Sequence, residues 1–552
     1  MAALSGNQIV ARSLKQQGVD YMFGVVGFPV YDVASQAQAE GIRYLGFRNE
    51  QSASYAAGAI GYLTGRPGAC LCVSGPGMVH GLAGLSNAWS NNWPMLLLGG
   101  ANDSYQNGQG AFQEAPQVEA ARPFAKYAAR PDQTARLPYY VEQAVRTSIN
   151  GRPGASYLDL SNDTLYGEVD EAKLRFPERC PEPVRPQADP ASIDAALAAL
   201  RSAKRPLVIV GKGAAYSGAS DEVREFIEKT QLPFLPTPMG KGVVPDSHSL
   251  SVAPARSFVL QNADLILLIG ARLNWILHFG LPPRFADDVR VVQIDISADE
   301  IGTNRPAEVG LVGDARNIVS QLNQALDAEP WSFAADSEWR SGIVTNLEKN
   351  QKQVDAMLAD DAVPMGYYRV LREIREQAPP ETIYVAEGAN TMDISRSVLA
   401  NEEPKRRLDA GSFGTMGVGA GFAIATAVAK PDNKVVCVQG DSAFGFAGME
   451  VETACRYQLP ITFVVINNNG IGIGGSSLPD DRTQSSPGLY TIDARYDKVV
   501  EAFGGKGYFA RTPDELSTAM KSAMSADGPA LVNVAIDPKA TGKPQKFGWL
   551  TH

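Results

Sequence analysis

The chain contains little that points to a disulfide framework, a membrane span or a nucleic-acid surface. Only 5 of its 552 residues are cysteines, which is too few for a disulfide scaffold, so we expect reduced thiols. No apolar run approaches the ~18 residues of a membrane-spanning helix, and residues 1–5, Met-Ala-Ala-Leu-Ser, do not begin a signal peptide. A net charge of −10 argues against nucleic acid as the main partner, because phosphate binding needs a basic face. We therefore expect a cytoplasmic protein that binds neither membranes nor nucleic acids.

Short apolar runs alternate with helical patterns throughout the chain. Such alternation is typical of α/β proteins, in which helices cover parallel sheets. A proline-rich stretch at 180–190 and a polar helical stretch at 337–359 interrupt the pattern, and about 150 residues per domain is usual. We predict three tandem α/β domains with parallel sheets, at residues 1–180, 190–330 and 360–552; the family resemblance described below implies that the last ends in a mobile tail.

A pair of oxygen donors follows two neighbouring apolar runs in the last third of the chain. Runs at 434–439 and 461–466, with a helical pattern at 448–457 between them, predict one βαβ unit. Its parallel strands end at the same edge of the sheet, which brings Asp441 and Asn468 side by side. A carboxylate, an amide oxygen and the Gly470 carbonyl are ligands that suit Mg²⁺, which normally also takes water and phosphate oxygens. The sequence therefore predicts a site for magnesium and a diphosphate, although Gly-Asp alone is more often a helix cap.

The pattern formed by Gly440-Asp441, the spacer that follows and Asn468 resembles the cofactor signature of thiamin-diphosphate enzymes. Residues 440–470, GDSAFGFAGMEVETACRYQLPITFVVINNNG, are similar to the branch of oxalyl-CoA decarboxylases and 2-hydroxyacyl-CoA lyases. The blocks GKGAAY, MGKGVVPD, GARLNWILHFG, EGANTMD and AFGGKGY resemble the same branch, and the resemblance runs from Gly6 to about Lys546. It implies pyrimidine-binding, middle and diphosphate-binding domains, as in acetohydroxyacid synthase, in a homodimer or homotetramer with the coenzyme between subunits.

The resemblance also assigns roles to single residues. Glu50 would hydrogen-bond the aminopyrimidine ring and favour the imino form that removes the C2 proton of the thiazolium; on its own it could equally be a first-turn helix glutamate. Met416 resembles the apolar residue that bends the cofactor, and Asn390 would touch the diphosphate or the substrate. The other cofactor positions implied are Gly440, Asp441, Ser442, Ala443, Asn468, Gly470 and Ile471, of which Asp441, Asn468 and Gly470 would hold the metal.

One loop favours the lyase over the decarboxylase. Decarboxylating relatives have a Tyr-Glu pair where this chain has Phe112 and Gln113, and the lyases resemble the present version. An apolar and amide wall suits a neutral 2-hydroxyacyl group better than the anionic oxalyl group. We therefore predict a 2-hydroxyacyl-CoA lyase with Glu50, Phe112 and Gln113 as catalytic residues, giving formyl-CoA and an aldehyde or ketone. The alternatives are an oxalyl-CoA decarboxylase, giving formyl-CoA and CO₂, and a non-catalytic homologue that binds thiamin diphosphate or CoA.

The resemblance breaks at one point and leaves the histidines unused. Residues 470–474 read Gly-Ile-Gly-Ile-Gly where both groups usually have Gly-Ile-Tyr, so the preferred acyl chain and the proton donor stay open. Many 2-keto-acid decarboxylases of the wider superfamily use paired histidines, whereas the 4 histidines here are scattered. We expect His80, on a predicted helix, to be a packed core residue.

Basic and acidic residues elsewhere resemble sites for anionic ligands. No Gly-x-x-x-x-Gly-Lys-Ser/Thr loop is present, which excludes a P-loop hydrolase. Five residues match places where relatives bind ADP as a regulator, the acids facing ribose or adenine and the bases phosphate: Arg152, Lys212, Arg272, Asp295 and Asp314. An Asp after a strand is often only a helix cap. Lys543 and Lys546 resemble phosphate partners of CoA in a closing tail, with a solvated terminus as the alternative.

Overall fold

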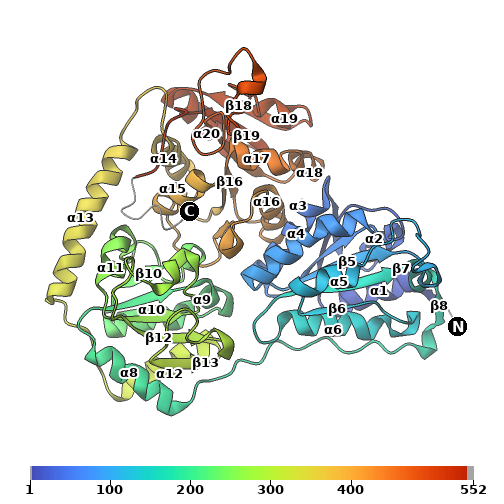
Figure 1. Ribbon diagram of the computed structural model, residues 1–552, viewed down its shortest axis with the longest axis horizontal. Coiled ribbons are helices and arrows are strands. Elements are labelled where there is room, and N and C mark those ends of the chain that lie inside the picture. The colour runs from blue at the N-terminus through green and yellow to red at the C-terminus, as the bar shows by residue number, and fades with distance from the viewer. Residues whose placement is uncertain (1–2, 544–552) are drawn as a thin grey trace.

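The strands of the first sheet are buried on both faces. The computed structural model describes residues 3–543 and places three parallel sheets in succession along the chain (Figure 1). In the first sheet, successive residues of one strand enter two different apolar clusters: Leu97 packs on one face and Leu96 and Leu98 on the other. The six strands, in the order β3-β2-β4-β5-β7-β6, are β2 (Tyr21–Gly24), β3 (Arg43–Gly46), β4 (Gly68–Cys72), β5 (Met95–Ala101), β6 (Tyr127–Ala129) and β7 (Ala155–Ser161).

Helices cover both faces of this sheet. A short antiparallel pair, β1 (Ala3–Ser5) and β8 (Glu168–Asp170), lies beside it. The helices are α1 (Gly6–Gln16), α2 (Tyr31–Ala39), α3 (Glu50–Thr64), α4 (Pro76–Asn91), α5 (Gln117–Ala121), α6 (Leu137–Ile149) and α7 (Asn162–Tyr166).

The middle sheet has five parallel strands with the same two-sided burial. Its order is β10-β9-β11-β12-β13. The strands are β9 (Pro206–Val210), β10 (Phe234–Pro236), β11 (Leu265–Ile269), β12 (Arg290–Asp295) and β13 (Val309–Val312). The helices are α8 (Pro190–Ser202), α9 (Lys212–Ser217), α10 (Ser220–Thr230), α11 (Arg256–Asn262) and α12 (Ala315–Ala328). The long helix α13 (Glu338–Leu358) then runs along the edge of the molecule to the third unit (Figure 1).

The third sheet carries the predicted βαβ unit. Its order is β15-β14-β16-β17-β19-β18 and all its pairs are parallel. The strands are β14 (Ile383–Glu387), β15 (Arg407–Asp409), β16 (Val435–Gly440), β17 (Ile461–Asn467), β18 (Lys506–Ala510) and β19 (Ala530–Ala535). The helices are α14 (Tyr367–Gln377), α15 (Ala389–Val398), α16 (Gly419–Ala429), α17 (Asp441–Ala447), α18 (Glu450–Arg456), α19 (Asp497–Glu501) and α20 (Pro513–Met524). The predicted α/β fold class with parallel sheets is confirmed.

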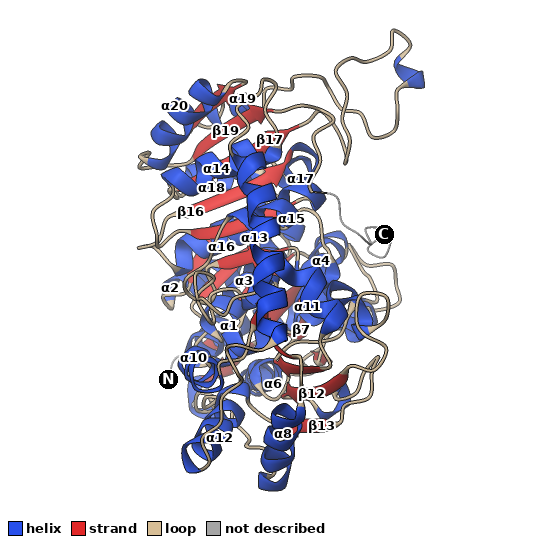
Figure 2. Ribbon diagram, turned by 90° about the vertical axis from the view of Figure 1, so that its left-hand side faces the viewer, coloured by secondary structure: helices blue, strands red, loops and turns tan. Residues whose placement is uncertain are grey.

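The crossover after β16 differs in one respect from the sequence pattern. Instead of one helix at 448–457, two helices follow the strand: α17 begins at Asp441 itself, and α18 begins at Glu450. After β17, the chain forms a long loop with a short 3₁₀ turn at Arg482–Gln484, which projects from the body of the molecule (Figure 2).

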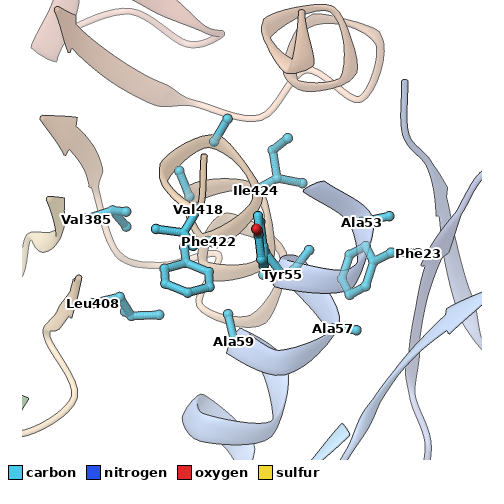
Figure 3. Packing of buried hydrophobic residues seen from close by; sticks show 14 of the residues in the cluster. Phe23, Ala53, Tyr55, Ala57, Ala59, Val385, Leu408, Val418, Phe422 and Ile424 are labelled. Atoms are coloured by element: carbon cyan, nitrogen blue, oxygen red, sulfur yellow. The ribbon is translucent and has the colours of Figure 1, made fainter. Parts of the chain in front are cut away.

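The first and third units share one apolar core. Helix α3 packs against α16, where Tyr55 and Phe422 place their ring centroids 6.4 Å apart (Figure 3). A Cβ on Gly421 would lie 2.5 Å from the Ser52 carbonyl, so the glycine permits the close approach of the two helices. The start of α3, at Glu50, is thereby fixed beside the third unit.

The cysteines and the helices bear on two of the expectations drawn from composition. All five cysteines are free thiols, and Cys70, Cys72, Cys180 and Cys437 are buried. Within residues 3–543, no helix is both long enough and apolar enough to cross a membrane.

Candidate functional site

Asp441 occupies the edge of the third sheet predicted for the metal. It follows β16, whose last residue Gly440 lies opposite Ile466 of β17, so the two strands end together. Its side chain is buried, with Oδ1 accepting from the Ser442 N–H at 2.8 Å and Oδ2 accepting from the Gly470 N–H at 2.9 Å. Burial raises the pKa of Asp441 to about 6, and backbone N–H groups, rather than a basic side chain, oppose that rise. A carboxylate held out of water in this way is suited to a cation.

The turn after β17 provides the remaining donors. The Asn468 amide nitrogen donates to the Gly472 carbonyl at 2.9 Å, and Asn390 donates to the same oxygen at 3.4 Å. The Asn468 amide oxygen and the Gly470 carbonyl are then the groups at this edge that could ligate a cation beside Asp441. No cluster of three or more His, Cys, Asp or Glu side chains able to hold a metal occurs in residues 3–543. One carboxylate, one amide and one backbone carbonyl fit Mg²⁺, which completes its shell with water and phosphate oxygens.

The remaining positions predicted for the cofactor surround these donors. Ala443 is fully buried on α17, and the Ser442 hydroxyl lies 3.1 Å from the Tyr490 hydroxyl. Ile471 is 56% exposed, and Gly472 has a φ of 72° with open space where a Cβ would lie. This side of the turn is therefore open.

A buried acid that the sequence analysis missed holds the Met416 loop. Glu387, at the end of β14, is fully buried and accepts hydrogen bonds from the Gly417 N–H, from the Gly419 N–H at 2.7 Å and from the Gln439 amide at 2.8 Å. Burial raises its pKa to about 7. Both sides of the turn after half-buried Met416 are thus anchored to one carboxylate. The only sequence signal was an acid at the end of an apolar run.

Glu50 begins helix α3, and its carboxylate has an unexpected partner. The Asn49 side chain caps the helix by accepting from the Gln51 N–H at 2.7 Å. The Glu50 Oε2 atom lies 3.1 Å from the His80 Nδ1 atom, and the Glu50 side chain is 13% exposed. The prediction that His80 is a packed core residue is wrong, because its side chain is 56% exposed on α4. The residue instead faces the predicted catalytic glutamate.

Phe112 and Gln113 border the same helix end. The Gln113 Oε1 atom accepts from the Ser74 hydroxyl at 3.0 Å, and a Cβ on Gly75 would lie 2.6 Å from the Gln113 carbonyl. The Phe112 ring is 68% exposed and makes an edge contact with Phe28 at 6.0 Å between centroids. The three predicted catalytic residues therefore lie around the amino end of α4.

Backbone contacts from the third unit hold the segment before Glu50. Glu450, at the start of α18, accepts from the Arg48 N–H at 3.2 Å and from the Asn49 N–H at 3.1 Å. It is 1% exposed, and burial raises its pKa to about 7. The sequence analysis missed this residue as well, because its partners are about 400 positions away in the chain.

Most residues predicted for ADP make contacts between or within domains. Arg152 pairs with Asp295 at 3.1 Å, and the Asp314 carboxylate caps α12 by accepting from the Arg316 N–H at 3.0 Å. Lys212 donates to the Asn91 side chain at 2.9 Å, and Arg272 donates to the Ser90 carbonyl at 2.8 Å. Asp314 thus matches the helix-cap alternative, and Lys212 and Arg272 join the middle domain to α4.

A cationic cluster that the sequence did not reveal lies between the middle and third units. Burial and the neighbouring Arg284 and Arg396 lower the pKa of Arg256 to about 10. Burial and two neighbouring guanidinium groups, those of Arg256 and Arg284, lower the pKa of His278 to about 4. Arg256 donates to the Ile276 carbonyl at 2.7 Å. Four nitrogen-bearing side chains from α11, α15 and the segment 275–284, namely Arg256, Arg396, His278 and Arg284, therefore lie close to one another.

The end of the described chain also reaches this region. The Lys543 ammonium donates to the Asn350 side chain of α13 at 2.8 Å, and its N–H donates to the Tyr368 hydroxyl at 3.2 Å. Lys546 lies outside the described residues.

The domain order and these donor sets define a class of protein. Family models match the chain in three places: the N-terminal TPP binding domain of thiamine pyrophosphate enzymes at residues 4–120, their central domain at 193–322, and their C-terminal TPP binding domain at 386–534. The chain belongs to the thiamine pyrophosphate enzyme family, and thiamin diphosphate is its cofactor.

Full-length relatives define the branch within that family. The chain is 50% identical to 2-hydroxyacyl-CoA lyase 1 of Mus musculus, over 99% of this chain and 97% of that protein. It is 48% identical to 2-hydroxyacyl-CoA lyase 1 of Homo sapiens, with the same coverage. Oxalyl-CoA decarboxylase of Escherichia coli (strain K12) is 43% identical, over 97% of this chain and 95% of that protein. The resemblance predicted from the sequence motifs is confirmed.

Proposed function

We propose that the protein is a 2-hydroxyacyl-CoA lyase that cleaves its substrate to formyl-CoA and an aldehyde or ketone. The observation that carries this proposal is the wall beside α4, where Phe112 and Gln113 present no ionisable group. The identity to the mouse and human lyases, 50% and 48%, is also higher than the 43% to the oxalyl-CoA decarboxylase of Escherichia coli. A wall of this kind does not stabilise the carboxylate of an oxalyl group.

The bound coenzyme supplies an electron sink for a carbanion next to a carbonyl carbon. Asp441, Asn468 and Gly470 would hold Mg²⁺ and, through it, the diphosphate. Glu50 would hold a proton against the aminopyrimidine ring, and His80 would orient the carboxylate that does so. Met416, on the loop anchored by Glu387, would support the bound coenzyme.

The proposed reaction balances without an external oxidant or reductant. The C1–C2 bond of the 2-hydroxyacyl group breaks, and the 2-hydroxyl group loses its proton as C2 becomes the carbonyl of the aldehyde or ketone. C1 gains a proton and stays on sulfur as formyl-CoA. Glu50 and His80, near the amino end of α4, would hold or move those protons, and the Gln113 amide would hydrogen-bond the reacting groups.

The cationic cluster supports a CoA thioester as the substrate. Arg256, Arg284 and Arg396 lie close together in a chain whose net charge is −10. Arg396 is also paired with Asp393 at 2.6 Å and with Asp409 at 3.0 Å, so its charge is partly offset and the proposal depends mainly on Arg256. Phosphate groups are strongly bound by converging guanidinium groups. Lys543 donates to Asn350, which itself donates to the Pro254 carbonyl two residues before Arg256, so Lys543 would add a further cation near the phosphates.

The alternative function, oxalyl-CoA decarboxylase, is separated from the lyase by one pair of assays. The protein is incubated with thiamin diphosphate, Mg²⁺, formyl-CoA and an aldehyde, and separately with oxalyl-CoA. Formation of a 2-hydroxyacyl-CoA at a kcat/KM well above that of oxalyl-CoA consumption supports the lyase. Faster consumption of oxalyl-CoA, with release of CO₂, contradicts it.

A second copy of the chain would complete the site. In the described part of one chain, no hydrogen bond or ion pair joins Glu50 to Asp441 or Asn468. Large apolar side chains near both sets are exposed, among them Phe28, Phe446 and Met449. We therefore propose a homodimer or homotetramer in which the two sets face each other across subunits, to be tested by sedimentation at assay concentrations.

A regulatory ADP site remains part of the proposal. Arg152 and Asp295 lie at the carboxyl end of β12, at the edge where α/β sheets bind ligands. Titration calorimetry with ADP should show saturable binding that Arg152→Ala weakens. Absence of heat at millimolar ADP would exclude the site.

A further inference from the structure

The segment that leads into Glu50 is held by the third unit at three points. Glu450 accepts from the backbone N–H groups of Arg48 and Asn49 at 3.2 and 3.1 Å. The Arg456 guanidinium donates to the Gly46 carbonyl at 2.7 Å, and the Tyr457 hydroxyl accepts from the Gly46 N–H at 2.8 Å. We call Glu450, Arg456 and Tyr457, which lie on α18 and at its carboxyl end, the α18 clamp.

The clamp acts on backbone groups that no regular element satisfies. Gly46 ends β3 and Glu50 begins α3, so residues 47–49 form the connection between them. Glu450 is nearly fully buried and is itself held by the Thr453 hydroxyl, which donates to Oε2 at 2.7 Å. Burying a carboxyl group is costly unless it is hydrogen-bonded. The buried Glu450 carboxyl group therefore fixes the N–H groups of Arg48 and Asn49, and with them the position of the next residue, Glu50.

Adhesion between the two units does not require this arrangement. The contact between α3 and α16 already joins them through an apolar core with Tyr55 and Phe422 at its centre (Figure 3). An apolar residue at position 450 would serve adhesion without a desolvation cost. The carboxylate of Glu450 is instead matched to the orientation of the 46–49 segment.

The clamp also connects two parts of the proposed site through the chain itself. Helix α17 begins at Asp441, and α18 follows it after Gly448 and Met449. The stretch from Asp441 to Tyr457 therefore carries a proposed metal ligand at its start, and its α18 end binds the backbone before Glu50.

We propose that Glu450 is a positioning residue for Glu50: through the α18 clamp, the diphosphate-binding unit sets the backbone direction in which Glu50 enters the site of the partner subunit. This inference rests on the proposed function, in which Glu50 acts on the aminopyrimidine ring. It makes Glu450 necessary for activation of the coenzyme and not for binding of the diphosphate.

The test compares four variants of the full-length protein. Glu450→Ala removes the acceptor, and Glu450→Gln keeps one oxygen for the Arg48 and Asn49 N–H groups. Tyr457→Phe removes a single hydroxyl of the clamp and serves if Glu450→Ala does not fold. Glu373→Gln is the matched control, because Glu373 is also a buried glutamate, 2.9 Å from Arg369 on α14, but contacts no residue of the clamp.

Four readouts separate positioning from general stability. Amide hydrogen exchange of a peptide covering residues 46–52 in the apo-protein should be about tenfold faster in Glu450→Ala. Hydrogen–deuterium exchange at C2 of bound thiamin diphosphate, and kcat, should fall about 100-fold. The Kd for thiamin diphosphate with Mg²⁺ should stay within about twofold of the parent. Glu450→Gln should recover most of the loss, and Tyr457→Phe should show the same pattern with smaller changes.

Two results would overturn the inference. One is parent-like exchange of residues 46–52 and parent-like C2 exchange in Glu450→Ala or Tyr457→Phe. The other is a loss of coenzyme affinity in proportion to kcat that Glu373→Gln reproduces, which would make Glu450 only a structural residue. Amide exchange and C2 exchange need no acyl-CoA, so they test the clamp even if the protein proves not to be a lyase.

Discussion

Glu387 offers a quantitative test of how the coenzyme-supporting loop is held. Its carboxyl group is fully buried, and burial raises its pKa from 4.5 to about 7. At about 1.4 kcal/mol per pKa unit, this shift corresponds to about 3 kcal/mol of stability. The native state holds the proton more tightly than the unfolded state, so stability should fall as pH rises from about 4.5 to about 7 and stay at the lower level above that range.

The perturbation is Glu387→Gln, which keeps the shape of the side chain and removes its titration. The thermal midpoint of the apo-protein is measured for parent and variant between pH 5 and pH 8. Other buried acids titrate in both proteins and cancel in the difference. The stability of the variant relative to the parent should therefore rise with pH, by up to about 3 kcal/mol across the window. At every pH the amide loses one acceptor for the Gly417 or Gly419 N–H, a constant cost of about 1–3 kcal/mol.

A difference between the two proteins that does not change with pH would refute this reasoning. It would mean that Glu387 is ionised in the native state throughout, and that the N–H groups of the Met416 loop outweigh its burial. The matched control is Glu376→Gln, the same substitution at an exposed position of α14.

Three further changes test the remaining parts of the site. His80→Ala removes the side-chain partner of Glu50 and should lower kcat about tenfold with coenzyme affinity unchanged. His80→Gln keeps a hydrogen-bond donor and should recover part of the rate. Equal rates in the parent and both variants would exclude an orienting role. The double change Phe112→Tyr and Gln113→Glu should raise the kcat/KM ratio of oxalyl-CoA to 2-hydroxyacyl-CoA at least tenfold, and an unchanged ratio would remove this loop from the specificity argument. Arg256→Ala should raise KM for the acyl-CoA about 10–100-fold with little change in kcat. The KM of the parent protein should also rise with salt concentration. A fall in kcat alone would place Arg256 outside the CoA site.

The βαβ unit was predictable because its signals are local. Two apolar runs, a crossover of ordinary length and two polar residues at the strand ends determine where Asp441 and Asn468 lie. Two helices connect the strands where the sequence predicts one, because an additional helix, α17, begins at Asp441 directly after β16.

Long-range contacts explain what the sequence did not reveal. Glu450 binds backbone groups 401 and 402 positions away, and Arg256 and Arg396 meet only because the middle and third units pack together. His80 was misjudged because a helix of small and apolar residues predicts a buried face but does not reveal whether that face meets the same chain or an open site. Such residues need the tertiary arrangement.

The central claim is that Asp441 and Asn468 bind a magnesium-linked coenzyme. The most direct measurement is titration calorimetry of thiamin diphosphate, with and without Mg²⁺, into the parent, Asp441→Asn and the exposed-site control Asp514→Asn. Asp441→Asn keeps one oxygen for the Ser442 or Gly470 N–H and loses the charge, so we expect Mg²⁺-dependent affinity to fall more than about 100-fold in a protein that stays folded. The lost acceptor should lower the stability by about 1–3 kcal/mol. Parent-like, Mg²⁺-dependent binding by Asp441→Asn would contradict the account.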